Sequence, residues 1–201
     1  DAAENTVYEL LLGECEVEEC LQKLEFEGVS LIPSNVNLAG AEIELIGVDK
    51  KEYILKNEID WIRDQYDFII IDCPPSLGLI TTNALNASDS VLIPVQCEYY
   101  ALEGLSQLMS SVQAVKRRYN DRLELEGVLL TMYDGRLNLT QQVVTEIKKY
   151  FPRKVFATVI PRTVRLSEAP SYGQPILYYD KSNKGCIAYG ALVDEILKKN
   201  R

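Results

Sequence analysis

Histidine is absent from this 201-residue chain, which excludes any mechanism that depends on a histidine base or a histidine metal ligand. The five cysteines form no C-x-x-C pair, so the sequence predicts neither a disulfide framework nor a zinc site and favours a reducing compartment. No apolar run approaches the roughly 20 residues that a membrane-spanning helix needs, and no secretory signal is visible near residue 1.

Positive charge is scarce in the first part of the chain. Residues 1–60 contain 15 acidic and 4 basic residues, whereas residues 61–201 contain 15 acidic and 17 basic residues. The net charge of −9 therefore arises at one end, and it does not exclude a basic face elsewhere on the protein.

Continuous apolar runs alternate with helical patterns along the chain. Unbroken apolar strands that are separated by helices indicate a parallel sheet covered on both faces. We therefore expect an α/β fold with a mostly parallel sheet, in a single domain that spans residues 1–201. The predicted strands are Val29–Pro33, Phe68–Asp72, Ser90–Val95, Leu125–Met132 and Val155–Pro161. The predicted helices are Thr6–Leu12, Ala39–Gln65, a stripe from Leu102 to Val115 closed by Lys116–Arg118, Leu139–Tyr150 and Lys184–Lys199.

The segment after Phe68–Asp72 carries the first candidate site. Ligands of a parallel sheet bind at the carboxyl ends of its strands, and Asp72 stands at such an end. A carboxylate there can hold Mg²⁺ or a water bound to it, because Mg²⁺ uses few protein carboxylates. Pro74 and Pro75 stiffen the following turn, and Gly78 permits a sharp bend before the next helix. The alternative is that Asp72 only caps that helix.

Four motifs give the chain a specific resemblance. They are DCPPSLGLITTNAL from Asp72, VLIPVQ with EYYALEG from Val91 to Gly104, LTMYDGRLN from Leu130, and IPRTVRLSEAPSYGQP from Ile160. In this order they resemble the ParA/Soj chromosome-partitioning ATPases, a branch of the deviant-Walker P-loop proteins that includes MinD. The resemblance runs from about Thr6 to Asn200 and implies a P-loop NTPase fold.

The resemblance also implies roles for individual residues. ATP and Mg²⁺ are the implied cofactors, with Asp72 holding the magnesium through water. Arg136 and Arg165 follow two predicted strands and match positions that bind DNA without sequence preference, although single exposed arginines are usually solvated. The implied switch residues are Pro74, Pro75, Ser76 and Gly78, and the residues implied to lie near the nucleotide base are Thr131, Met132, Pro161 and Arg162. For Met132 and Pro161, core packing and a turn are equally open interpretations.

Partners and location follow from the same resemblance. It implies an ATP-dependent homodimer that binds non-specific double-stranded DNA, is stimulated by a ParB-type adaptor protein, and works in the cytoplasm on the nucleoid. The C-terminal helix carries Asp194 and Glu195 among its cations, so we expect it to dock on the sheet and do not expect stable membrane association.

One part of the family pattern is missing. No G-x-x-x-x-G-K-[ST] loop occurs in the 201 residues: Gly185 and Gly190 have the spacing, but Ala191 follows. We therefore expect a chain that lacks the N-terminal strand and phosphate loop, does not hydrolyse ATP by itself, and aggregates or folds only partly. The alternatives are a natural, non-enzymatic short form and a MinD-like ATPase that cycles on membranes.

Overall fold

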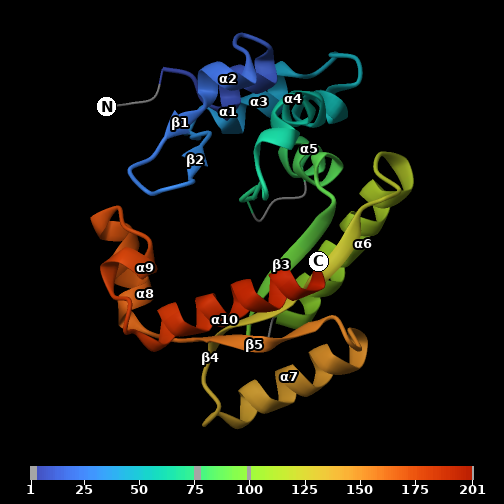
Figure 1. Cartoon of the computed structure of the whole chain (residues 1–201). Coiled ribbons are helices and arrows are strands. Elements are labelled where there is room, and N and C mark those ends of the chain that lie inside the picture. The colour runs from blue at the N-terminus through green and yellow to red at the C-terminus, as the bar shows by residue number, and fades with distance from the viewer. Residues whose placement is uncertain (1–3, 75–77, 99–100, 201) are drawn as a thin grey trace. The chain divides into compact units, whose positions relative to one another are not determined.

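The computed structural model describes residues 4–74, 78–98 and 101–200 (Figure 1). The chain divides into two compact units. The first unit comprises Asp1–Ser90 and Ser110–Leu123, and the second comprises Val91–Met109 and Glu124–Arg201. Helix α6, Ala101–Arg118, contributes residues to both units. Within the described ranges, no helix is long and apolar enough to cross a membrane.

Short helices make up most of the first unit. Its only paired strands among the described residues are two residues each, β1 (Gln22–Lys23) and β2 (Ser30–Leu31), which run antiparallel. The helices are α1 (Val7–Leu12), α2 (Val17–Cys20), α3 (Leu38–Glu44), α4 (Ile54–Ile62) and α5 (Leu79–Ala87). Two 3₁₀ turns, η1 (Lys51–Tyr53) and η2 (Arg63–Gln65), flank α4.

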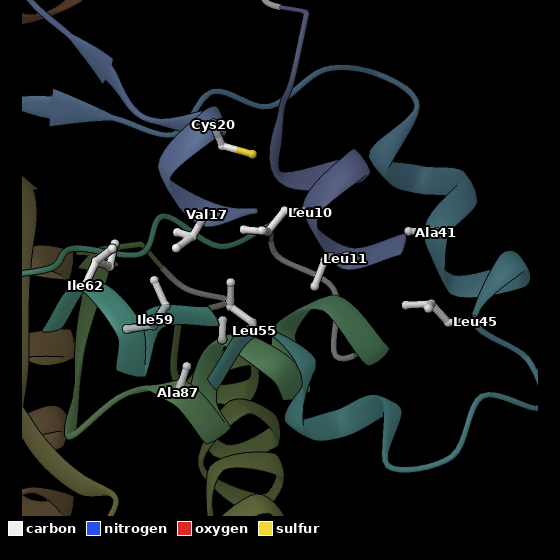
Figure 2. Packing of buried hydrophobic residues seen from close by; sticks show 11 residues of the cluster. Leu10, Leu11, Val17, Cys20, Ala41, Leu45, Leu55, Ile59, Ile62 and Ala87 are labelled. Carbon is white, nitrogen blue, oxygen red and sulfur yellow. The ribbon is translucent and has the colours of Figure 1, made fainter. Parts of the chain in front are cut away.

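Local capping explains where α1 begins and ends. The Thr6 hydroxyl accepts a hydrogen bond from the Tyr8 backbone N–H, and the Glu9 carboxylate accepts one from the Thr6 backbone N–H. Gly13 ends the helix in the left-handed conformation, with φ of 74°. The capped helix then buries Leu10 and Leu11 against α2, α3 and α4, as Figure 2 shows.

A three-stranded sheet forms the centre of the second unit. Its order is β3 (Ser90–Gln96), β4 (Glu124–Tyr133), β5 (Val155–Pro161), and β4 and β5 are parallel. The connection between β4 and β5 contains α7 (Asn138–Tyr150). After β5 come α8 (Val164–Glu168), η3 (Ala169–Tyr172), α9 (Ile176–Tyr179) and α10 (Lys184–Lys199).

Alternate residues of β4 belong to two different hydrophobic clusters. Val128 and Leu130 pack with α7 residues such as Ile147, whereas Leu129 packs with Leu192 of α10. Because successive side chains of a strand point to opposite faces, helices cover both faces of this sheet (Figure 1). The expected α/β class, with a parallel sheet between helices, is confirmed, and so is the docking of α10 on the sheet.

Three predicted elements differ from the structure. Residues 67–74 form no regular element, although Phe68–Asp72 is as apolar as the other predicted strands, and the Ile70 side chain is 90% exposed. The helix predicted over Ala39–Gln65 is interrupted between α3 and α4, where Gly47 and Lys50 adopt φ of 87° and 53°. The strand predicted over Val29–Pro33 shrinks to β2. The single-domain expectation stays a prediction.

Candidate functional site

The carboxyl ends of β4 and β5 lie side by side. Tyr133 at the end of β4 pairs with Pro161 at the end of β5. Of the four residues implied to lie near a nucleotide base, Thr131 and Met132 are on β4, Pro161 is the last residue of β5, and Arg162 follows it. The sheet register therefore brings these two predicted pairs together at the carboxyl ends of the strands, which is where parallel sheets bind ligands.

Met132 combines two unusual features. Its φ is 49°, a left-handed backbone conformation that is uncommon for a residue with a side chain, and its side chain is 46% exposed. Such strained positions cluster at functional sites. Core packing, which was one interpretation of Met132 from the sequence, is not what this exposure indicates.

Arg136 lies in the loop that follows β4 and is held by Asp134. Its Nε and Nη2 groups donate to the two carboxylate oxygens at 2.9 and 2.6 Å, and its backbone N–H donates to Oδ1 at 3.1 Å. Arg136 holds the pKa of Asp134 well below its usual range, and Asp134 raises the pKa of Arg136. The Arg136 side chain stays 89% exposed, so its guanidinium is oriented yet accessible.

Arg165 occupies the equivalent place after β5, in α8. Nη1 donates to Glu168 Oε2 at 2.9 Å, and Nε lies 3.6 Å from Asp180 Oδ2. The guanidinium carbon is 5.9 Å from the centre of the Tyr179 ring, which itself stacks on Tyr172. The hydrogen bond to Glu168, followed by that to Tyr179, raises the pKa of Arg165.

The magnesium and switch candidates lie in the first unit. Asp72 is exposed on the irregular segment before α5, and Pro74 is exposed two residues later. Gly78 is the N-cap of α5. Pro75 and Ser76 lie outside the described residues. No group of three or more cysteine, aspartate or glutamate residues with metal-binding geometry is present in the described ranges.

Glu42 on α3 contacts the start of α5, and the sequence does not indicate this contact. Its Oε1 accepts a hydrogen bond from the Ile80 backbone N–H at 3.4 Å, and a Cβ added to Gly78 would collide with the same carboxylate. A negative charge at the first turn of α5 is favoured by the free N–H groups there. Because 38 residues separate Glu42 from Ile80, no local motif signals this contact.

The candidate residues of each unit have side chains of the type that their predicted role needs. A single exposed carboxylate such as Asp72 suits Mg²⁺, which keeps several of its waters. An exposed Met132 offers a polarisable apolar contact to a base, and Arg162, which follows β5, is also exposed.

Comparisons with known proteins show which family the chain resembles. Residues 1–125 match the family described as AAA domain. The chain is 50% identical over 200 residues to the chromosome partitioning protein ParA of Myxococcus xanthus, covering 100% of this chain and 71% of that protein. It is 53% identical over 193 residues to the sporulation initiation inhibitor protein Soj of Bacillus subtilis, covering 96% and 76%.

A solved structure gives the same result for the fold. Cobyrinic acid a,c-diamide synthase from Mycobacterium smegmatis, with a bound ATP analog and magnesium, superposes with a TM-score of 0.84 at 35% identity, covering 100% of this chain and 76% of that one. On these identities and coverages, the chain belongs to the ParA/Soj family of chromosome-partitioning ATPases.

Proposed function

We propose that this protein acts in chromosome or plasmid partitioning as a Mg·ATP-dependent dimer that binds DNA without sequence preference through Arg136 and Arg165. The observation that carries the proposal is the placement of the two arginines. Each follows one of two neighbouring parallel strands, so both emerge at the same edge of the sheet.

The ion pairs of these arginines are compatible with phosphate binding. Asp134 uses Nε and Nη2 of Arg136, and Glu168 uses Nη1 of Arg165. In the described part of the chain, this leaves Nη1 of Arg136 and Nη2 of Arg165 without a hydrogen-bond acceptor. Guanidinium groups that are already oriented lose less conformational entropy when they bind a phosphate, and they read no base sequence.

Nucleotide binding is assigned to the other candidates. Thr131, Met132, Pro161 and Arg162 would contact the base, and Asp72 would hold the magnesium through a water molecule. Pro74, Pro75, Ser76 and Gly78 would sense the terminal phosphate. The Mg²⁺ ion would supply charge neutralisation at the phosphates, while Asp72 would fix the position of its water shell.

Further parts of the proposal rest on family membership. They are dimerisation on ATP, stimulation by a ParB-type adaptor protein, and work in the cytoplasm on the nucleoid. A dimer presents two copies of the arginine pair, and binding at two sites raises the overall affinity without a new contact.

The 201 residues contain no G-x-x-x-x-G-K-[ST] loop, so we propose that they do not turn over ATP by themselves. A phosphate-release assay on the purified chain tests this part. Magnesium-dependent turnover that disappears in Asp72→Ala would contradict it.

The DNA proposal is tested with Arg136→Ala and Arg165→Ala in a chain extended at its N-terminus by a phosphate loop, because the 201 residues contain none. Fluorescence anisotropy with a labelled duplex of random sequence, with and without Mg·ATP and over a range of salt, gives the affinity and its salt dependence. Each variant is expected to weaken DNA binding. The slope of the logarithm of the binding constant against the logarithm of the salt concentration is expected to fall in magnitude by about one unit. Lys149→Ala is the control, because this exposed lysine lies on α7 and pairs only weakly with Glu146, at 3.8 Å. Binding by both arginine variants that equals the parent at every salt concentration places the DNA contact elsewhere.

A membrane-cycling role like that of MinD is the second candidate, and one feature of α10 favours it. Tyr189, Val193 and Leu197 are exposed at intervals of four residues on this helix, whose last turn carries Lys198 and Lys199. Co-sedimentation with anionic liposomes, lost in a Lys198→Ala, Lys199→Ala double variant, would promote this candidate above the DNA-binding role.

A further inference from the structure

Two of the five cysteines face each other in the first unit. Cys15 lies between α1 and α2, Cys20 is the last residue of α2, and their Sγ atoms are 3.2 Å apart. Cys20 is fully buried in the hydrophobic cluster that Figure 2 shows, whereas Cys15 is half-buried. All five cysteines are free thiols.

We propose that Cys15 and Cys20 are an oxidation site, at which a peroxide converts the two thiols into a reversible intramolecular disulfide. A disulfide bond is about 2 Å long, so the sulfurs need to approach by only about 1 Å. The two cysteines are five positions apart in the sequence, so the bond would close a short loop. No other sulfur–sulfur contact occurs in the ranges that the structure describes.

The exposure of the two thiols sets the order of the steps. The Cys15 sulfur, which solvent reaches, attacks one oxygen of the peroxide and becomes a sulfenic acid, and the other oxygen leaves as water or an alcohol. The Cys20 sulfur then attacks the Cys15 sulfur, the S–O bond breaks, and the hydroxide takes the Cys20 proton and leaves as water. Two electrons and two protons pass from the thiols to the peroxide, and a dithiol reductant reverses the change.

Cys20 suits the role of the second, resolving thiol. Burial, together with the hydrogen bond to Cys15, raises the pKa of Cys20 to about 12, so it stays protonated at neutral pH. Its Sγ also lies 3.6 Å from the Thr6 carbonyl oxygen, to which the thiol donates. A protonated, buried thiol resists direct oxidation, so the peroxide reacts at Cys15 first, and Cys20 loses its proton as it attacks the Cys15 sulfur.

The disulfide would join two elements of the first unit. Cys15 belongs to the turn after α1, and Cys20 ends α2 and contacts the residue that caps α1. Oxidation would therefore fix the turn between α1 and α2. We expect slower backbone hydrogen exchange there.

Mass spectrometry of the oxidised full chain tests this inference. The first basic residue of the chain is Lys23, so one tryptic peptide ending at Lys23 contains both cysteines. After treatment with hydrogen peroxide and alkylation, this peptide is expected to carry no alkyl group and to be lighter than the reduced peptide by two hydrogen atoms. Dithiothreitol is expected to restore both alkylation sites.

Variants separate the proposed pair from unspecific oxidation. Cys15→Ser is expected to leave Cys20 reduced and alkylated after the same treatment, and Cys20→Ala is expected to leave Cys15 overoxidised. Cys186→Ser, which removes a buried thiol of α10, is the matched control and is expected to leave the disulfide unchanged. Recovery of Cys20 as an alkylated thiol in the oxidised parent, or of Cys15 linked to Cys73 or to a second chain, overturns the inference.

Discussion

Two apolar segments of similar composition have different structures in this protein. Leu129 and Leu130 of β4 are buried between the helices that cover the sheet, with β5 paired alongside. Phe68 and Ile70 belong to a run that is just as apolar, yet they are 53% and 90% exposed on an irregular segment. Apolar composition indicates that a segment can be buried as a strand. Whether it becomes one depends on a neighbour that completes its hydrogen bonds.

The largest contrast is expected between Leu130→Ala and Ile70→Ala. Leu130 is 2% exposed, so its truncation should lower the free energy of unfolding by about 2–5 kcal/mol. The exposed Ile70 should tolerate the same change within about 0.5 kcal/mol. Urea unfolding followed by circular dichroism measures both. Equal losses would mean that residues 68–71 are buried like β4 and that the contrast is wrong.

A second substitution tests the polar contacts by which α5 is joined to α4 and η1 in the first unit. The buried Asn83 side chain accepts from the Leu55 backbone N–H at 3.1 Å and donates to the carbonyl oxygens of Lys51 and Leu79 at 2.9 and 3.2 Å. Asn83→Ala removes these three buried side-chain hydrogen bonds and should cost about 2–3 kcal/mol in the same unfolding experiment. Thr82→Ala is the control, since its hydroxyl bonds only within α5, to the Gly78 carbonyl oxygen. A cost for Asn83→Ala no larger than the control's would contradict this account of the first unit.

Close packing in the second unit is tested at Gly127 of β4. A Cβ there would lie 2.6 Å from the Phe156 ring and 3.0 Å from the Lys154 carbonyl oxygen, so Gly127→Ala should destabilise the protein by roughly 1–3 kcal/mol. Gly104→Ala on α6 meets nothing within 4 Å and should be neutral or stabilising. Thermal unfolding of the two variants compares them directly. A neutral Gly127→Ala would show that Phe156 and the Lys154 carbonyl oxygen pack less closely against Gly127 than these distances indicate.

Glu195 of α10 gives the second unit a pH dependence. Burial raises the pKa of its carboxyl, but hydrogen bonds from the Ala157 and Thr158 backbone N–H groups outweigh it and hold the pKa below its usual value. A lowered native pKa stabilises the fold above the unfolded value near 4.3 and loses that contribution as pH falls further. Glu195→Gln should cost about 1 kcal/mol at pH 7, a figure discounted for solvent screening. The difference should shrink below about pH 4, as urea titrations of both proteins can show; a constant difference would contradict the assignment.

The smallest expected effect concerns the loop after β4. Asp134→Asn removes the charge that competes with phosphate for Arg136, so affinity for random-sequence DNA should rise about threefold at low salt. Anisotropy titration measures this, with Glu146→Gln on α7 as the control. Weaker DNA binding would mean that Asp134 serves mainly to orient Arg136.

The sequence predicted the second unit far better than the first. The bounds of β5 and α10 agree with the expectation, and β3, β4 and α7 agree within one residue at each end, because each strand has its neighbours in the same stretch of chain. The break between α3 and α4 was missed because Lys50 adopts a left-handed conformation that its residue type does not indicate.

For the candidate site, too, only some features could be predicted from the sequence. The placement of Arg136 and Arg165 after neighbouring strands could be predicted, since strand order and residue spacing decide it. Their carboxylate partners and the position of Glu42 could not, because side-chain rotamers and a contact across 38 residues decide those.

The contact between Glu195 and β5 has a consequence for self-association. In the described sheet β5 has β4 as its one neighbour, and exposed N–H groups on an outer strand invite the strand of another molecule to pair with it. Glu195 occupies two such groups, at Ala157 and Thr158, and places a negative charge beside them. Fibre-like, edge-to-edge growth from this side of the sheet would first have to displace that carboxylate, so acidic conditions should promote aggregation here before the sheet itself melts.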